Sequence, residues 1–108
     1  MADLPPGQRV LNLCRACHTL DPGARTLIGP NLHGIFGRRA GSVEGYRYSA
    51  GMRQLGETGH VWSEETIRRW VSNPQAMVPR TAMKFPGLPD PQQINDLIPF
   101  LKEATGGS

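Results

Sequence analysis

The chain of 108 residues has few of the side chains that usually build a protein core. Leu, Ile, Val and Phe together number 23, and Gly and Pro also number 23. A chain of this length allows one small domain, and so thin a core usually needs disulfides, a metal or a cofactor for stability. We therefore expect a single domain over residues 1–108, with disordered ends at about 1–5 and 105–108, that is stabilised by more than its own side chains.

Other absences exclude whole classes of protein. No run of about 18 apolar residues occurs, which excludes a transmembrane helix within this sequence. Two cysteines are too few for a disulfide scaffold. The formal net charge is only +3 and no run of Lys and Arg exceeds two residues, so we expect no nucleic-acid partner. Intrinsically disordered chains often have a high net charge, and this chain does not.

Three main segments and one short segment are predicted to be helical. The first runs from about residue 5 or 7 to residue 18 and has apolar residues at helical spacing. The second, over 63–72, begins after a favourable N-cap serine and stops at an Asn-Pro pair. The third, over 90–105, has Pro at its first position and a predicted capping box, and an internal proline at 99 predicts a kink. A short helix over 49–55 is also expected.

Long segments between these helices carry the strongest hint of function. Residues 19–48 and 74–89 are rich in Gly and Pro and lack the alternation of a strand. Long irregular loops inside a compact domain are uncommon and are usually functional. Because the chain has too few apolar side chains to fill such loops, we infer that they wrap around a non-protein group.

The sequence Cys14-Arg15-Ala16-Cys17-His18 is the attachment pattern of a c-type heme. Positions i, i+3 and i+4 share one helix face, so two thiols can bond the two vinyl groups of one porphyrin while the imidazole reaches the iron. A redox dithiol belongs near a βαβ pattern, and a zinc site needs four ligands; the sequence has neither. The pattern predicts one covalent heme c.

The ligand on the other face of the iron decides the function. His/Met ligation favours electron transfer, whereas an open sixth position favours gas binding or peroxide chemistry. Met77 and Met83 both lie in the second long loop, far enough from His18 in sequence to return to the opposite heme face. Met52 lies on the predicted short helix, where a methionine is more often part of the core. Spacing alone leaves both Met77 and Met83 as candidates.

Further motifs follow the attachment pattern in order. They are GPNLHGIFGR at 29–38, GYRYS at 45–49, WSEET at 62–66, NP at 73–74, VPRTAMKF at 78–85 and DLI at 96–98. With these motifs, nearly the whole chain resembles the class I c-type cytochromes, the family of mitochondrial cytochrome c and its short bacterial relatives. The resemblance implies an all-α fold in which the first and last helices cross and long loops enclose one heme.

The resemblance also implies roles for individual residues. His18 would be the proximal iron ligand and Met83 the distal one, and the carbonyl of Pro30 would accept the Nδ1 proton of His18. Four residues would bind or balance the heme propionates: Arg38, Tyr48, Trp62 and Thr81. Two aromatic residues would line the heme, namely Trp70 and Phe85.

The chain departs from the family pattern in several places. Trp70 stands where the family commonly has a tyrosine near the distal methionine, and Arg80 replaces the glycine of a Pro-Gly-Thr turn. The Lys-rich ring of the mitochondrial members is mostly lost, since the matching positions hold Leu13, Leu27, Gln75, Ala76 and Ala82. We therefore expect docking of partner proteins to depend less on charge than it does in those members.

These features predict a monomeric one-electron carrier rather than an enzyme. The expected partners are electron-donor and electron-acceptor proteins, such as a quinol–cytochrome c reductase and a terminal oxidase or reductase. Two alternatives remain: an electron-entry domain of a larger or membrane-anchored oxidoreductase, and a peroxidase or gas-binding protein with an open sixth position. Because the thioether bonds form outside the cytoplasm, we expect the bacterial periplasm, or else the mitochondrial intermembrane space.

Overall fold

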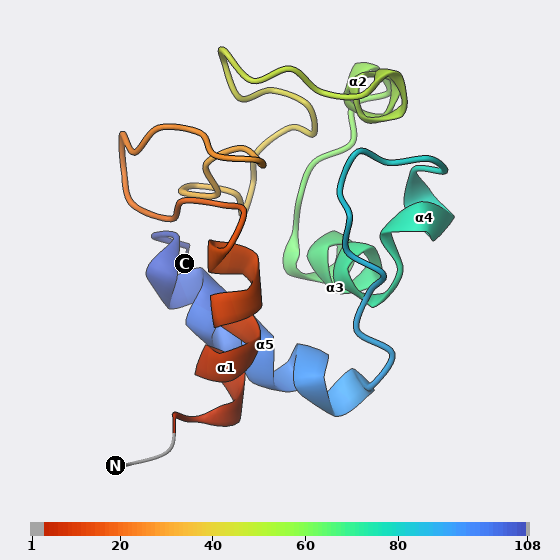
Figure 1. The fold of residues 1–108 in the computed structure, drawn as a ribbon. Helices are drawn as coiled ribbons and strands as arrows, with labels where there is room; N and C mark the ends of the chain where they lie inside the picture. The colour runs from red at the N-terminus through yellow and green to blue at the C-terminus, as the bar shows by residue number, and fades with distance from the viewer. Residues whose placement is uncertain (1–3, 108) are drawn as a thin grey trace.

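The structure is a computed structural model that describes residues 4–107. Its five helices, in chain order, are α1 (Pro6–Arg15), α2 (Ala50–Glu57), α3 (Glu64–Ser72), α4 (Pro74–Met77) and α5 (Pro91–Ala104) (Figure 1). Within the described residues no strand forms, and a single isolated antiparallel bridge joins Arg39 to Val61. The predicted all-α fold with long loops is confirmed.

The first and last helices cross, as expected (Figure 1). The crossing is close because α1 contributes Gly7, where an added Cβ would overlap the carbonyl oxygen of Asp96 and the ring of Phe100 on α5. A residue without a side chain therefore lets the two backbones approach each other.

Helix α3 begins where the sequence predicted. The hydroxyl of Ser63 accepts a hydrogen bond from the Thr66 N–H at 3.2 Å, and the Thr66 hydroxyl accepts one from the Ser63 N–H at 2.7 Å. This reciprocal pair satisfies two N–H groups that the helix itself leaves unpaired. An exposed ion pair from Glu64 to Lys102, at 3.1 Å, then links α3 to α5.

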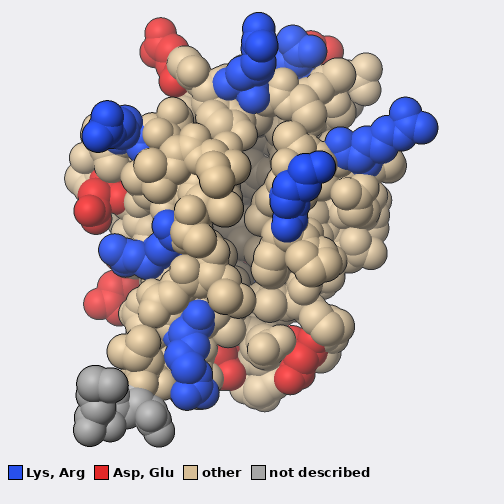
Figure 2. Space-filling model, viewed as in Figure 1, with Lys and Arg blue, Asp and Glu red and all other residues tan. Residues whose placement is uncertain are grey.

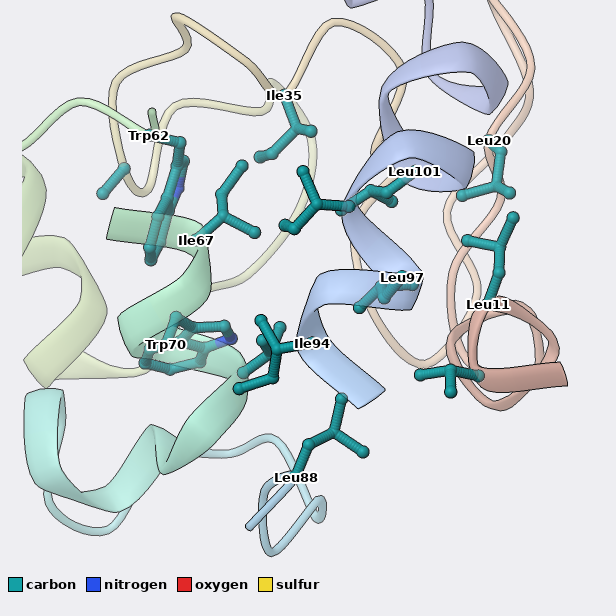
Figure 3. Close-up of a cluster of buried hydrophobic side chains, with 14 of the residues drawn as sticks. Leu11, Leu20, Ile35, Trp62, Ile67, Trp70, Leu88, Ile94, Leu97 and Leu101 are labelled. Atoms are coloured by element: carbon teal, nitrogen blue, oxygen red, sulfur yellow. The ribbon is translucent and has the colours of Figure 1, made fainter. Parts of the chain in front are cut away.

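The hydrophobic core lies on both sides of α5 (Figure 3). On one side Leu11 and Leu20 pack against it, and on the other side lie the residues of α3 and the segment before it. There the rings of Trp62 and Trp70 meet edge to face, with centroids 5.6 Å apart and planes at 66°. Such aromatic pairs contribute about 0.5–1.5 kcal/mol beyond the area that they bury.

Several helix boundaries differ from the prediction. Helix α1 ends at Arg15 rather than at residue 18, and α4 occupies part of a segment predicted to be a loop. The Asn-Pro pair at 73–74, which we interpreted only as a stop signal, also places Pro at the first position of α4, where proline is favoured. Helix α5 continues through Pro99 without a break.

The ends of α5 also differ from expectation. Asp90 caps the helix by accepting a hydrogen bond from the Gln92 N–H at 2.9 Å, in place of the predicted capping box with Gln93. At the other end, Thr105 is fully buried and its hydroxyl donates to the Leu101 carbonyl oxygen at 2.7 Å. The tail expected to be disordered from residue 105 is therefore packed as far as 107; residues 1–3 and 108 lie outside the described residues.

Candidate cofactor-binding site

The two cysteines and His18 lie at the end of α1. The N–H groups of Cys17 and His18 both donate to the Cys14 carbonyl oxygen, at 3.0 and 2.9 Å, and so add one further turn to the helix. Both cysteines are half-buried, and they form no disulfide with each other. Two free thiols one turn apart are therefore available for bonds to one ligand.

The electrostatics of Cys14 disfavour the redox-dithiol alternative. Burial, and secondarily the neighbouring Cys17, raise the pKa of the Cys14 thiol to about 11. Reactive cysteines of redox C-x-x-C motifs have a lowered pKa, because the thiolate is the nucleophile. Cys14 is instead protonated at neutral pH.

The ring of His18 is oriented by one hydrogen bond. Its Nδ1 lies 2.7 Å from the carbonyl oxygen of Pro30, which can only accept, so Nδ1 carries the proton and Nε2 carries the lone pair. Burial lowers the pKa of His18, although the bond to Pro30 acts in the opposite direction. The imidazole is therefore neutral at pH 7 and presents Nε2 as a metal ligand.

Gly29 forms the wall beside this ring. An added Cβ at Gly29 would overlap Cε1 of His18, and the Gly29 N–H donates to the Cys17 carbonyl oxygen at 2.7 Å. We did not single out Gly29 from the sequence. The Gly-Pro dipeptide at 29–30, a common turn signal, offered the only indication that the chain passes so close to a side chain here.

Asn31 and Arg38 hold the loop after His18 together. The Asn31 amide donates to the carbonyl oxygens of Asp21 and Ala24, at 3.0 and 2.9 Å. The guanidinium of Arg38 donates to the carbonyl oxygens of Asn31, at 2.8 Å, and His33. Asn31 lies in the motif at 29–38, but the motif alone predicts no role for it.

The structure brings three of the predicted propionate-binding residues together. The backbone N–H of Trp62 donates to the Arg38 carbonyl oxygen at 2.8 Å, and the Tyr48 hydroxyl accepts from the backbone N–H of Val43 at 3.0 Å. Burial lowers the pKa of Arg38 and raises that of Tyr48, and their mutual attraction partly opposes both shifts. Trp62 and Arg38 are thus joined through their backbones, and Tyr48 is near enough to Arg38 to affect its pKa; Thr81, on another segment, has no hydrogen bond to any of the three.

Met83 lies on the segment that follows α4. Its N–H donates to the hydroxyl of the buried Thr81 at 3.3 Å, and its side chain packs on the core, as does that of Phe85. Met52 and Met77 also pack partly on the core, so burial alone does not distinguish the three methionines.

A cleft separates the segments that carry His18 and Met83. Figure 2 shows this cleft down the middle of one face, with Lys and Arg side chains on both sides of it. In the same view the loops that follow α1 lie on one side of the molecule, and α3, α4 and the segment after α4 lie on the other (Figure 1).

The residues present fit a covalently attached heme. Two free thiols and an imidazole whose Nε2 makes no hydrogen bond among the described residues lie together at the end of α1. No three His, Cys, Asp or Glu side chains in residues 4–107 gather as ligands of a metal ion alone. The two thiols can bond one ligand at two points while the imidazole offers Nε2 to its metal.

The sequence is also similar to characterised proteins. It is 41% identical to cytochrome c2 of Afifella marina over 96 residues, and the aligned region covers 89% of this chain and 77% of the relative. It is 42% identical to cytochrome c of Sesamum indicum over 104 residues, and the aligned region covers 95% of this chain and 91% of the relative. The chain belongs to the class I c-type cytochromes. No protein-family model matches it.

Membership of this family confirms the predicted heme c and the predicted function class. The protein is a monoheme electron carrier, and the relatives do not favour either alternative considered above. None of the helices in residues 4–107 has the length and apolar character that crossing a bilayer takes.

Proposed function

We propose that this cytochrome passes single electrons between two redox proteins, with its iron held by Nε2 of His18 and Sδ of Met83. The observation that carries the proposal is the hydrogen bond from His18 Nδ1 to Pro30, which leaves Nε2 as the only ring atom able to bind a metal. When bound, heme c supplies an iron that gains and loses one electron.

Met83 is a better distal ligand than Met77 because of the backbone that carries each. Met77 is the last residue of α4, a helix that packs against α3. Met83 lies on an irregular segment on the far side of the cleft from His18, where its N–H is held by Thr81. The family resemblance independently assigns the ligand to Met83.

The surrounding residues would tune the site and exclude water. The guanidinium of Arg38 would offset propionate charge, and the Tyr48 hydroxyl and the Trp62 indole N–H would donate hydrogen bonds to the propionates. The apolar shell contains five buried residues, Ile35, Ile67, Trp70, Leu97 and Leu101. A dry apolar environment and a thioether ligand both raise the reduction potential. We further propose that the protein is not an enzyme, because the proposed ligands leave no coordination position for a substrate.

The proposed docking surface lies beside Cys17 and includes three exposed apolar side chains. Leu13, one turn before Cys17, is 57% exposed, and Leu27 and Ile28 are 49% and 76% exposed. The Leu27 N–H donates to the Gly29 carbonyl oxygen at 3.1 Å, and the Gly29 N–H donates to the Cys17 carbonyl oxygen. The segment of Leu27 and Ile28 therefore lies beside the attachment site. We propose that a quinol–cytochrome c reductase and a terminal oxidase or reductase dock here, on a monomer.

The chemistry of attachment also supports a compartment. Thioether formation joins reduced thiols to heme outside the cytoplasm. We therefore propose a bacterial periplasm, or else a mitochondrial intermembrane space.

The ligand assignment is tested by two matched variants. Met83→Ala should abolish the red charge-transfer band of a ferric heme with thioether ligation and lower the reduction potential. Met77→Ala is the matched control, because it removes a methionine of similar burial on a nearby segment. This variant should keep both the band and the reduction potential. An unchanged ferric spectrum in Met83→Ala would refute the assignment.

A further inference from the structure

The turn before Met83 has an unusual residue at its tightest position. The Thr81 N–H donates to the Val78 carbonyl oxygen at 3.1 Å, which closes a four-residue turn with Pro79 second and Arg80 third. Arg80 has a φ of 60°, and it is the only residue other than glycine in 4–107 with a positive φ. A turn of this kind favours glycine at the third position, because a Cβ crowds the backbone there. The backbone is therefore strained at Arg80.

A side chain from α4 holds this strained turn. The Arg80 N–H donates to Oε1 of Gln75 at 2.7 Å. Both residues are exposed, so water competes for each partner when the bond opens. The short distance nevertheless ties the third residue of the turn to the helix that precedes it.

The turn is directly connected to Met83. Thr81, its last residue, is only 6% exposed, and its hydroxyl accepts the hydrogen bond from the Met83 N–H. If the turn opens, Thr81 leaves its buried site and the backbone of Met83 loses this partner. Gln75, Arg80 and Thr81 therefore form one chain of contacts that ends at the methionine.

We propose that Gln75 is a positioning residue for Met83 and that it holds a turn which Arg80 strains. The proposal rests on the proposed role of Met83 as distal ligand. It follows that Met83 leaves the iron more readily in this cytochrome than it would with glycine at position 80, and that the side-chain oxygen of Gln75 limits this loss.

The first test compares Arg80→Gly with Arg80→Ala in the ferric holoprotein. Imidazole serves as the probe, because it must displace the distal ligand before it binds. Arg80→Gly relieves the strain and should lower the affinity for imidazole about three- to tenfold, since glycine also gains freedom when the turn opens. Arg80→Ala keeps the Cβ, and its affinity should stay within about twofold of the parent protein.

The second test concerns the bond from α4. Gln75→Ala removes the acceptor and should raise the affinity for imidazole about two- to fivefold, the effect of one exposed hydrogen bond. Gln75→Glu keeps an acceptor oxygen and should restore the parent value. In the Arg80→Gly background, the effect of Gln75→Ala should be smaller, because the relaxed turn depends less on the bond.

Amide hydrogen exchange separates this proposal from the assignment of the ligand. Exchange at the Thr81 N–H reports opening of the turn whichever residue binds the iron, and it should slow in Arg80→Gly and quicken in Gln75→Ala. Unchanged exchange and imidazole affinity in Arg80→Gly would overturn the proposal. Equal effects of Arg80→Ala and Arg80→Gly would also overturn it, because the arginine side chain rather than the backbone would then be responsible.

Discussion

The backbone of Gly29 lies against the imidazole of His18, so close that a methyl group on Gly29 would overlap the ring. The same glycine donates its N–H to the Cys17 carbonyl oxygen. The chain therefore needs a residue without a side chain at the point where the loop turns back toward the attachment site.

Gly29→Ala should displace His18 or the loop. Overpacking at a site bounded by a ring and a backbone hydrogen bond costs about 1–3 kcal/mol, and we expect that loss in the free energy of unfolding measured with urea. Gly23→Ala is the control, because a Cβ there meets no atom within 4 Å although its φ is +72°. Gly29 itself has no positive φ, so a loss of stability in Gly29→Ala reports the contact with His18, whereas any loss in Gly23→Ala reports backbone strain alone. An unchanged free energy of unfolding in Gly29→Ala would contradict the contact.

The buried edge of His60 predicts a pH dependence. This side chain is half-buried, its Nε2 has no hydrogen-bond partner, and its ring meets that of Trp62 edge to face with centroids 4.8 Å apart. Burial, and secondarily Arg69, lower the pKa of His60. The unfolded chain therefore binds a proton more readily at this residue than the folded chain does.

The free energy of unfolding should consequently fall as the pH drops below about 6.5, the ordinary histidine value, and this contribution should level off below the lower pKa of the folded state. His60→Gln should lack the contribution. Urea midpoints measured from about pH 8 to pH 5 check it, with the difference between parent and variant removing the effects of other groups. Parallel pH profiles for the two proteins would count against a buried, neutral His60.

The exposed leucines beside Cys17 predict weak salt dependence. Because Leu13 and Leu27 carry no charge, the rate of reduction by a solubilised quinol–cytochrome c reductase should change little with ionic strength. Leu13→Lys or Leu27→Lys should raise the rate about two- to fivefold at low salt and make it fall as salt is added. A steep salt dependence of the parent protein would contradict the proposed apolar docking surface.

The thin core predicts dependence on the attached group. A chain with Cys14→Ala and Cys17→Ala cannot form thioether bonds and should be largely unfolded at neutral pH, as far-UV circular dichroism would show. The holoprotein is the control and should unfold cooperatively in urea. Cooperative unfolding of the double variant would mean that its own side chains suffice for the fold.

Some parts of the fold that depend on neighbouring residues were predictable from the sequence, whereas the capping box expected at Asp90 and Gln93 was not formed. Ser63 and Thr66 cap α3 through atoms three residues apart, and the attachment pattern lies within one helical turn. The short helix α4 was missed because an Asn-Pro pair ends one helix and begins the next, and either interpretation satisfies the backbone locally.

Contacts between segments distant in the sequence were harder to predict. The resemblance anticipated the bond from His18 to Pro30. The role of Gly29 depends on where the loop passes, which is fixed in part by the hydrogen bond from the Gly29 N–H to the Cys17 carbonyl oxygen. The bond between Gln75 and Arg80 likewise exists only because α4 forms and turns the glutamine toward the next loop.

The aromatic pair in the core determines what tryptophan spectroscopy can detect in this protein. Trp62 and Trp70 are the only tryptophans in the chain, and both belong to the cluster around α3. Their fluorescence and near-ultraviolet signals therefore sample a single region. A partly unfolded species that has lost α2 but kept α3 against α5 would look native by these signals, and detecting it would need a reporter placed elsewhere.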